Sequence, residues 1–287
     1  MSKSVCLETR ELKFSYPDGP TALHGISLDV KRGDFVAVIG QNGSGKTTLA
    51  KHFNGLLRPD AGKVCLFGED IASRNVSQLA QDVGYVFQNP DHQIFSATVR
   101  EEIDFGPRNL GCSNDKVDRR TEEAIEYFGL GNFADCQPAV LGFGLRRKVS
   151  IAAVYAMKTP VLILDEPTSG LDLKSTNELM AVISELHRLE HTIILITHDM
   201  RVVAEYVPHC MVMRGGEILA HDETREIFKN SELLLETQIA VPQISELGNR
   251  MTPYGMPDDV LTVPEFADEY SRILSGLEEG KKSADRR

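Results

Sequence analysis

A glycine-rich loop constrains the fold of this chain more than any other feature of the sequence. Residues 40–47 follow the pattern glycine, four residues, glycine, lysine, and then serine or threonine. The continuous apolar run 35–39 precedes the loop and is typical of a strand buried in a parallel sheet. Apolar residues at 49, 53 and 56 follow the loop at helical spacing. Strand, glycine loop and helix in this order predict an α/β fold with a phosphate-binding loop.

The residue types in this loop suit a nucleoside triphosphate. Glycines let backbone N–H groups approach phosphate oxygens, and the start of the following helix adds unpaired donors. We expect Lys46 to reach the β- and γ-phosphates of ATP, and the Thr47 hydroxyl to bind Mg²⁺. The alternative is a tight strand–helix turn without a ligand. The predicted ATP-binding residues are Gly40, Gln41, Asn42, Gly43, Ser44, Gly45, Lys46, Thr47 and Thr48.

Two acidic residues end a second buried strand. The apolar run 161–164 is followed directly by Asp165 and Glu166. In P-loop enzymes a carboxylate at the end of a strand anchors Mg²⁺, and this role falls to Asp165. Glu166 is placed to act as a general base on the attacking water. Because the phosphate loop accompanies them, the two acids predict ATP hydrolysis.

The remaining segments predict the domain organisation. Near-alternating apolar residues between 5 and 30 indicate antiparallel strands. Residues 89–157 carry helical spacing and few strand signals, so we expect an inserted helical subdomain. Strand signals at 161–164 and 192–197 flank an amphipathic helix, which indicates a parallel sheet. From about 231 the pattern weakens, and we expect the charged tail after Gly276 to be frayed.

Charge and hydropathy exclude several classes of protein. The formal net charge is −11, and no Lys/Arg stripe suggests nucleic-acid binding. All apolar runs are far shorter than the ~20 residues that span a bilayer. We expect the adjacent cations 146–148 to form a solvated helix face. His187 and His191 are expected to lie on an exposed helix face rather than at a metal site.

Taken in order, these residues resemble the ATPases of ATP-binding-cassette (ABC) transporters over roughly residues 3–230. The resemblance implies a RecA-like parallel-sheet core, an antiparallel β-subdomain and a helical subdomain at about residues 89–157. It also implies roles for single residues. Tyr16 stacks on adenine, and Gln88 acts in catalysis and senses Mg²⁺ and the membrane partner. Asp172 lies in a loop that crosses the dimer interface, and His198 contacts the γ-phosphate as a catalytic switch.

A narrower resemblance is carried by residues 88–95 and 99–110, which are similar to the energy-coupling-factor and cobalt/nickel importer branch. It implies that the ATPase pairs with a second ATPase at the cytoplasmic face of the cell membrane, as a peripheral subunit. An integral membrane coupling protein and a membrane subunit that binds the substrate would complete the transporter. The cargo of such importers is a vitamin or a transition-metal ion. The extension 231–287 would help the two ATPases dimerise.

One predicted loop departs from the family pattern. ABC ATPases usually carry Leu-Ser-Gly-Gly-Gln as a signature that acts in trans on ATP held by the partner subunit. Here the aligned residues are Leu141, Gly142, Phe143, Gly144 and Leu145. The serine hydroxyl and the glutamine amide are lost, and losing one such donor typically slows an enzyme roughly 100- to 1000-fold. We therefore expect a heterodimer with one slow site, or a divergent homodimer with weak activity, unless Gly142 and Gly144 still form an anion-binding nest.

Two other functions are compatible with a phosphate loop. A soluble ABC ATPase of cluster assembly, DNA repair or translation is the first, and a P-loop kinase is the second. Translation members usually carry two cassettes and repair members long coiled coils, and this chain of 287 residues has neither. A kinase is disfavoured because Asp165, Glu166 and His198 suit attack by water. A transporter ATPase that uses ATP and Mg²⁺ is the function that the sequence predicts.

Overall fold

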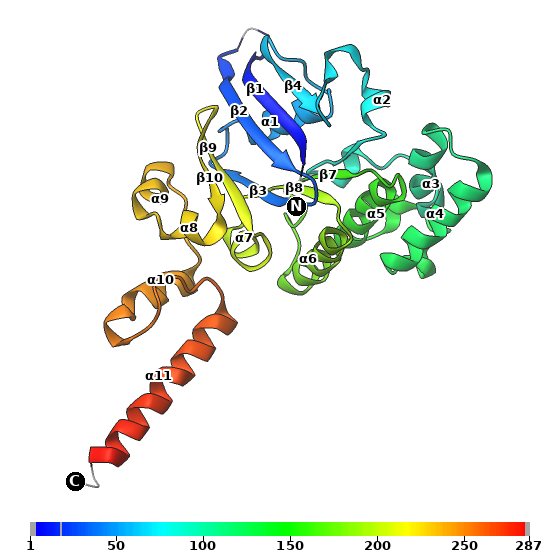
Figure 1. The fold of residues 1–287 in the computed structure, drawn as a ribbon. Helices are drawn as coiled ribbons and strands as arrows, with labels where there is room; N and C mark the ends of the chain where they lie inside the picture. Colours follow the sequence, from blue (N-terminus) through cyan, green and yellow to red (C-terminus); the bar gives the residue numbers. More distant parts are fainter. Residues whose placement is uncertain (1–3, 18, 285–287) are drawn as a thin grey trace.

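The computed structural model describes residues 4–17 and 19–284 and contains two sheets flanked by helices (Figure 1). The larger sheet has six strands in the order β10-β9-β3-β8-β7-β6. All neighbouring pairs in it are parallel except β9 and β10, which form a hairpin. Its strands are β3 (Phe35–Gly40), β6 (Val83–Val86), β7 (Val161–Asp165), β8 (Thr192–Ile196), β9 (His209–Arg214) and β10 (Glu217–Glu223).

The central strands are buried on both faces, which explains why they are continuous apolar runs in the sequence. Every residue of β3, β7 and β8 is buried. Because these strands are parallel, their carboxyl ends meet at one edge of the sheet. Val38 pairs with Ile196, which in turn pairs with Asp165. The register therefore brings the phosphate loop, the two acids and the residues after β8 to the same edge.

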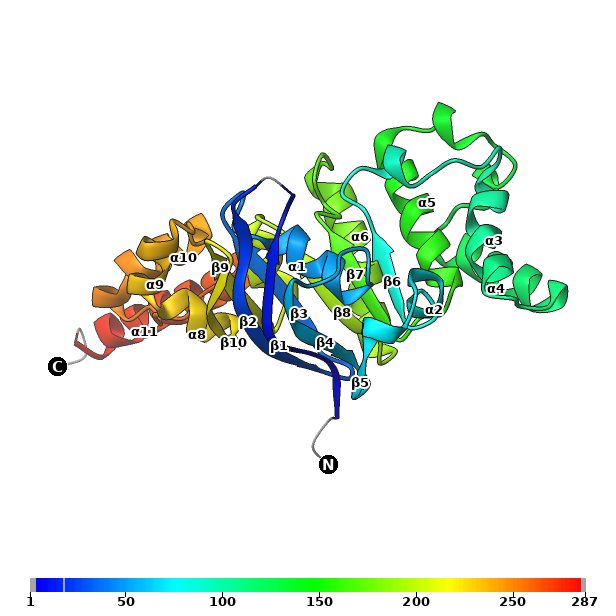
Figure 2. The ribbon, with the colours of Figure 1, turned by 90° about the horizontal axis from the view of Figure 1, so that it is seen from above.

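The second sheet is antiparallel, with strand order β2-β1-β4-β5. Its alternating burial pattern matches the alternating sequence of its long strands, because one face packs on the core and the other meets solvent. Helix α1 (Lys46–Phe53) lies between the two sheets in Figure 2. The strands are β1 (Val5–Ser15), β2 (Thr21–Lys31), β4 (Ala61–Leu66) and β5 (Glu69–Asp70), followed by helix α2 (Val76–Leu79).

The segment between β6 and β7 forms the predicted helical subdomain. It contains helices α3 (Val99–Asn109), α4 (Asn114–Tyr127) and α5 (Phe143–Ala156), which pack on one another at the right of Figure 1. Helix α5 also contacts β6, so it joins the subdomain to the sheet. The hydrophobic core is continuous across this junction, since one cluster includes Ile103, Ala152 and Leu164.

Helix α6 (Leu173–Arg188) and helix α7 (Met200–Tyr206) complete the core, and the chain then leads into the C-terminal helices. These are α8 (Thr224–Lys229), α9 (Ser231–Thr237), α10 (Gln243–Arg250) and α11 (Val263–Ala284). Figures 1 and 2 show α11 projecting from the body of the protein. Helix α11 runs past Gly276 to Ala284, where the sequence predicts a frayed tail, and residues 285–287 lie outside the described part.

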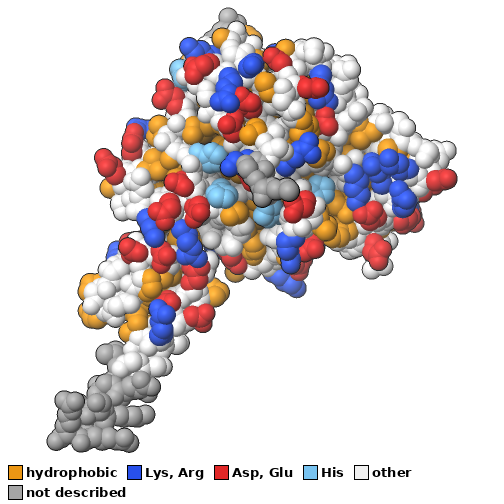
Figure 3. All heavy atoms as spheres, viewed as in Figure 1, with side chains coloured by type: hydrophobic (Ala, Val, Ile, Leu, Met, Phe, Trp, Pro, Cys, Tyr) orange, Lys and Arg blue, Asp and Glu red, His pale blue; other side chains and the backbone are white. Residues whose placement is uncertain are grey.

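Charged side chains of both signs are interspersed over the face shown in Figure 3, with a basic group over the helical subdomain at the right. Within the helical subdomain, Arg100 pairs with Glu122 and Arg108 pairs with Asp104. This face therefore carries no continuous basic stripe. Among the described residues, no helix is both long enough and apolar enough to cross a membrane.

Candidate functional site

The phosphate loop turns sharply from β3 into α1, and its glycines are required by space as well as by backbone conformation. Gly40 has φ 148°, and a Cβ there would come within 2.2 Å of the Met213 carbonyl oxygen. Gly45 has φ 101°, and a Cβ would lie 2.9 Å from the Ala22 carbonyl oxygen. Only glycine fits both constraints, so the sequence pattern of the loop follows from its geometry.

Lys46 is buried at the start of α1 and folds back over the loop. Its ammonium group donates to the carbonyl oxygens of Gly40 and Gln41, both at 2.8 Å. Burial lowers the pKa of Lys46, while the nearby charges of Glu166 and Asp165 oppose that effect. The ammonium group is thus held within the loop, at the centre of the predicted phosphate site.

Asp165 gathers hydroxyl groups from two neighbouring elements. Thr47 Oγ1 donates to the two carboxylate oxygens at 3.3 and 3.1 Å, and the Tyr85 hydroxyl donates to Oδ2 at 2.9 Å. Burial raises the pKa of Asp165, and the hydrogen bonds from Tyr85 and Thr47 oppose this rise. Tyr85 is a site residue that the sequence did not reveal, because a tyrosine in an apolar strand is usually a packing residue.

Glu166 and His198 form a second pair at the same edge. His198 Nδ1 donates to Glu166 Oε1 at 2.7 Å, and the Thr197 hydroxyl lies 3.5 Å from the other carboxylate oxygen. Glu166 has φ 48°, a left-handed conformation that is unfavourable for a residue with a side chain. Such strain persists where surrounding contacts determine it, and here the Glu166 amide donates to the Ile196 carbonyl oxygen at 2.8 Å.

Two predicted residues lie at the rim of the site. Tyr16 is about 42% exposed, and its hydroxyl lies 3.1 Å from the Thr48 hydroxyl on α1. This bond holds the partly exposed tyrosine beside the phosphate loop. Gln88 is exposed and comes two residues after β6, next to the strand that ends at Asp165. The structure thus places Gln88 at the same sheet edge as the two acids.

The predicted signature loop begins helix α5. Gly142 occupies the N-cap position with φ −62°, where no side chain caps the helix. Leu141 is buried, and Phe143, Gly144 and Leu145 form the first turn. A Cβ at Gly142 would meet nothing, so a serine would fit there. Asp172 caps helix α6 by accepting a hydrogen bond from the Ser175 amide at 2.7 Å, which lowers the pKa of Asp172.

Two expectations about surface residues are wrong. Arg147 is fully buried, and its guanidinium donates to the carbonyl oxygens of Phe87 and Gln88. His187 and His191 are partly buried, with ring nitrogens 3.1 Å from Gly33 O and 3.0 Å from Thr159 O, respectively. Helical spacing does not show which loops from elsewhere cover a helix, and His191 lies beyond α6, which ends at Arg188. Among the described residues no cluster could hold a metal through these histidines.

The donor set fits ATP and Mg²⁺. Ser44 Oγ is buried in the phosphate loop and has no hydrogen-bond partner among the described residues, which leaves a hydroxyl donor for a phosphate oxygen. Thr47 and Asp165 offer adjacent oxygen ligands of the kind that Mg²⁺ prefers. Lys46 would hold phosphate, and Glu166 is buried beside His198.

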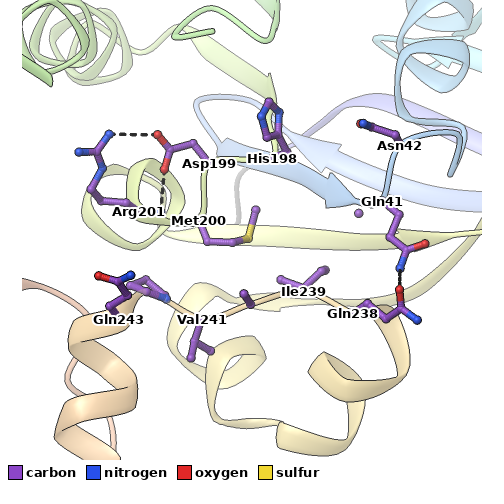
Figure 4. A pocket seen from close by; sticks show the side chains of 13 residues that line it. Gln41, Asn42, His198, Asp199, Met200, Arg201, Gln238, Ile239, Val241 and Gln243 are labelled. Atoms are coloured by element: carbon purple, nitrogen blue, oxygen red, sulfur yellow. Dashed lines mark hydrogen bonds and ion pairs between the residues drawn. The ribbon is translucent and has the colours of Figure 1, made fainter. Parts of the chain in front are cut away.

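A cavity of about 630 Å³ lies beside the phosphate loop (Figure 4). Gln41, Asn42 and His198 line one side of it, and residues 238–243 after α9 line the other. The amide of Gln41 donates to Gln238 Oε1 at 2.7 Å, so the C-terminal segment touches the phosphate loop directly. The cavity therefore links the nucleotide site to the C-terminal helices.

Comparisons with known proteins agree with this geometry. A family model described as ABC transporter matches residues 23–169. The energy-coupling factor transporter ATP-binding protein EcfA of Methanothermobacter thermautotrophicus is 41% identical, over 94% of this chain and 88% of that protein. An ABC transporter ATP-binding protein of Caldanaerobacter subterraneus is 44% identical over 86% of this chain, which spans 43% of the length of that relative.

A solved structure shares the fold. It is cbiO1 from Clostridium perfringens, described as part of the ABC transporter complex cbiONQ. It is 35% identical, with a TM-score of 0.74 over 85% of this chain and 99% of that one. This likeness shows that the chain has the α/β fold of an ABC ATPase cassette. The chain therefore belongs to the ABC transporter family of ATP-binding proteins, and it is an ATPase.

Proposed function

We propose that this chain is the ATP-hydrolysing subunit of an energy-coupling-factor importer, which takes up a vitamin or a cobalt or nickel ion. The observation that carries the hydrolytic part is the pair of Glu166 and His198, 2.7 Å apart beside the Asp165–Thr47 pair. Similarity to an energy-coupling factor ATP-binding protein over nearly the whole chain supports the importer class. The subunit would work at the cytoplasmic face of the cell membrane.

The geometry assigns distinct tasks to the residues of the site. Lys46 and the loop amides would bind the phosphates, and Tyr16 would support the adenine ring. Thr47 and Asp165, with Gln88 through water, would hold Mg²⁺, which neutralises the charge that builds up on the phosphates. The oxygen of the attacking water forms a bond to the γ-phosphorus while Glu166 takes a proton from that water. The bond from that phosphorus to the bridging oxygen breaks, and ADP and phosphate leave.

His198 keeps the base in place. Its Nδ1–H donates to Glu166 Oε1, and the Thr197 hydroxyl lies 3.5 Å from Oε2. As an imidazolium the ring donates from both nitrogens, so Nε2–H of the largely exposed His198 would then be available for the γ-phosphate. The contact thereby connects the state of the nucleotide to the position of the base.

The catalytic assignment is tested by Glu166→Gln, which keeps the size of the side chain and removes the base. We expect ATP hydrolysis to fall about 10²- to 10⁴-fold, while ATP binding persists. Phosphate release and nucleotide binding are measured on the same preparations. A rate within tenfold of the unaltered protein would contradict the role of Glu166.

A groove on the helical subdomain is suited to bind a membrane partner. The groove has a volume of about 200 Å³ and lies between the loop after Gln88 and the loop before α5. Phe95 is about 65% exposed at its rim, with its ring 4.6 Å from that of Phe105, which is also exposed. Exposed aromatic pairs beside a groove suit an amphipathic helix of a partner. We propose that the integral membrane coupling protein docks here.

The docking proposal is tested by affinity purification of the full chain from detergent-solubilised native membranes. We expect an integral membrane protein, a substrate-binding membrane subunit and a second ATPase to co-purify. Phe95→Ser with Phe105→Ser should remove the membrane proteins and keep basal ATP hydrolysis. Membrane partners that survive this double change would contradict docking at the groove.

A soluble ABC ATPase is the second candidate. It would purify without membrane proteins, and nucleic acid or ribosomes would stimulate its ATPase activity. The interspersed charges of Figure 3 disfavour a nucleic-acid partner. The same purification therefore separates the two functions.

The partner ATPase is proposed to be a different chain with an intact signature. In that arrangement the phosphate loop of this chain and the signature of the partner make the fast site. The site completed by Gly142 and Leu145 would be slow, because neither residue supplies a side-chain donor. The ATPase rate of this chain alone, compared with the rate after adding the second ATPase, tests the arrangement. Full-speed hydrolysis by this chain alone would contradict it.

A further inference from the structure

One arginine lies wholly inside the protein, where helix α5 meets the loop after β6. Arg147 has no exposed surface, and its Nη1 donates to Phe87 O at 2.8 Å while Nη2 donates to Gln88 O. Within the described residues no carboxylate forms an ion pair with this guanidinium, and its Nε is buried without a partner. Burying a charge in this way opposes folding. The two hydrogen bonds and the nearby charges of Asp165 and Glu166 offset part of this cost.

The two carbonyl groups belong to the loop that carries Gln88. This loop leaves the sheet at the end of β6 and enters the helical subdomain. A second tie to α5 comes from Gln93, whose amide donates to Ser150 O at 2.8 Å and accepts from the Phe87 amide at 3.2 Å. The loop is thus bound to helix α5 at two points, and Arg147 is the one adjacent to Gln88.

Arg147 also touches the first turn of its own helix. Its guanidinium carbon lies 5.4 Å from the centre of the Phe143 ring, in the signature loop. The same ring packs against Gly170, since a Cβ at that glycine would come within 3.1 Å of it. Three loops therefore meet around the Phe143 ring and the Arg147 guanidinium: the Gln88 loop, the signature loop and the loop that ends at Asp172.

We propose that Arg147 is a positioning residue that ties the Gln88 loop to the signature loop, so that each moves with the other. Gln88 faces the ATP of this chain, whereas the signature loop completes the site of the partner. A displacement at one site would reach the other through one turn of a rigid helix, which is a physical path for coupling between sites. This inference rests on the proposed roles of Gln88 and of the signature loop.

The first test addresses the tie itself and is independent of ATP hydrolysis. In the full chain, Arg147→Met should increase amide hydrogen exchange across residues 87–93 about tenfold, with the phosphate loop unchanged. The melting temperature should change little, because the loss of two hydrogen bonds opposes the removal of a buried charge at similar volume. Lys148→Met is the matched control, since Lys148 pairs with Glu178 on the exposed side of the same helix. Unchanged exchange in 87–93 would overturn the inference.

Arg147→Lys provides a second variant in case the methionine form does not fold. A lysine keeps the charge but lacks the two-pronged geometry of the guanidinium. It should give a smaller increase in exchange across 87–93 than Arg147→Met. If hydrogen exchange in Arg147→Lys equals that of the unaltered chain, charge alone holds the loop and the double hydrogen bond does not. That result would overturn the assignment.

The second test asks whether Arg147 acts through Gln88. Gln88→Ala removes the side chain and leaves intact the carbonyl that Arg147 binds. In the ATPase pair, each single change should raise the Mg²⁺ concentration for half-maximal hydrolysis about tenfold, and the double change should add nothing. Additive effects would overturn the path through Gln88. If Gln88→Ala alone has no effect, the proposed role of Gln88 fails, while the exchange test still decides the tie.

The third test asks whether Arg147 carries coupling between the two sites. The Hill coefficient for ATP in the pair should fall toward one in Arg147→Met and stay unchanged in Lys148→Met. An equal Hill coefficient in all three proteins would overturn the coupling.

Discussion

Removing the Tyr85 hydroxyl tests whether it orients Asp165, because the packing of the tyrosine ring is left unchanged. It donates to Asp165 Oδ2 at 2.9 Å, and the ring lies in the core of the sheet. Tyr85→Phe keeps the ring and removes one hydrogen bond to the proposed Mg²⁺ ligand. We expect Mn²⁺ binding, titrated by electron paramagnetic resonance with a non-hydrolysable ATP analogue, to weaken on the order of 10-fold.

Tyr155→Phe is the matched control for this change. The Tyr155 hydroxyl also donates to a carboxylate at 2.9 Å, that of Glu123, but in the helical subdomain. Metal binding should be unaltered in this control. Equal Mn²⁺ affinity in both variants and the unaltered protein would show that Tyr85 does not orient Asp165.

His52 makes stability depend on pH. The ring is fully buried on α1, with Nδ1 2.8 Å from Thr48 O, and burial lowers its pKa. A histidine with a lowered folded-state pKa is neutral in the folded protein, while the unfolded chain binds protons below about pH 6.5. Stability is therefore full above that pH and declines as the pH falls below it.

Replacing His52 should reduce this dependence. His52→Gln keeps a donor and cannot be protonated in this range. We expect its melting temperature to change less between pH 7 and pH 5 than that of the unaltered protein. The exposed His92, changed to Gln, serves as the control and should leave the pH dependence as it was. An identical pH dependence in His52→Gln and the unaltered protein would count against this account.

Single residues of the site could be predicted where chemistry and local sequence coincide. Lys46, Thr47, Asp165 and Glu166 lie in short motifs, and the structure brings them together. Tyr85 and Arg147 could not be predicted in the same way. Their partners lie 80 and 60 residues away, so their roles depend on strand register and loop packing rather than on neighbours in the chain.

At the scale of elements, helix α5 begins without the donors that its family uses. Gly142 sits at the N-cap in a conformation that serine also adopts, and its Cβ position is open. Gly142→Ser together with Leu145→Gln should therefore restore two side-chain donors without distorting the helix. We expect ATP hydrolysis by the chain alone to rise on the order of 100-fold, measured as phosphate release.

The single variants Gly142→Ser and Leu145→Gln measure how much each donor contributes to the rate. Serine alone should give a part of the gain, since it also caps the helix. A double variant with the rate of the unaltered chain would show that the first-turn amides of α5 already serve the site. That result would favour the anion nest that Gly142 and Gly144 suggest from the sequence.

The sequence predicts strands best where both faces of the strand are buried. The continuous apolar runs of β3, β7 and β8 identify strands of a parallel sheet, and all three are fully buried. Segments covered by other parts of the chain were predicted less well. His191 lies beyond the end of α6 rather than on a helix face, because the helix ends at Arg188.

At the scale of the whole molecule, the C-terminal extension divides into a part that packs on the core and a part that does not. Leu233, Leu234 and Leu261 belong to the main hydrophobic core. Tyr254, Val263 and Tyr270 are exposed. We propose that the exposed set contributes to pairing of two ATPases, as the sequence predicts for residues 231–287.

Two truncations distinguish these parts. Residues 1–262 lack α11 and should keep the melting temperature, while the dissociation constant of the ATPase pair rises on the order of 100-fold. Residues 1–230 also lack three core leucines and should unfold several degrees lower, because each buried leucine contributes about 2 kcal/mol. Light scattering and thermal unfolding measure the two effects. Unchanged pairing in 1–262 would contradict a role for α11.

The alternation of strands and helices predicts the parallel sheet, but not which strands are neighbours. The placement of β3 between β8 and β9 follows from packing of the complete chain. The contact of Gln41 with Gln238 is of the same kind, since 197 residues separate the two. Long-range pairings of this sort contain no local signal that a single sequence displays.

Strands β6 and β7 are adjacent in the sheet although 74 residues separate them, from 87 to 160. The intervening helices can therefore vary without any change in strand order. This makes the segment an exchangeable module. A chimera that receives residues 89–140 from a related ATPase would keep the ATP site and acquire a different surface at the proposed docking groove. Recombination at residues 89 and 140 would give related transporters different membrane partners, while the residues that hydrolyse ATP at the sheet edge stay the same.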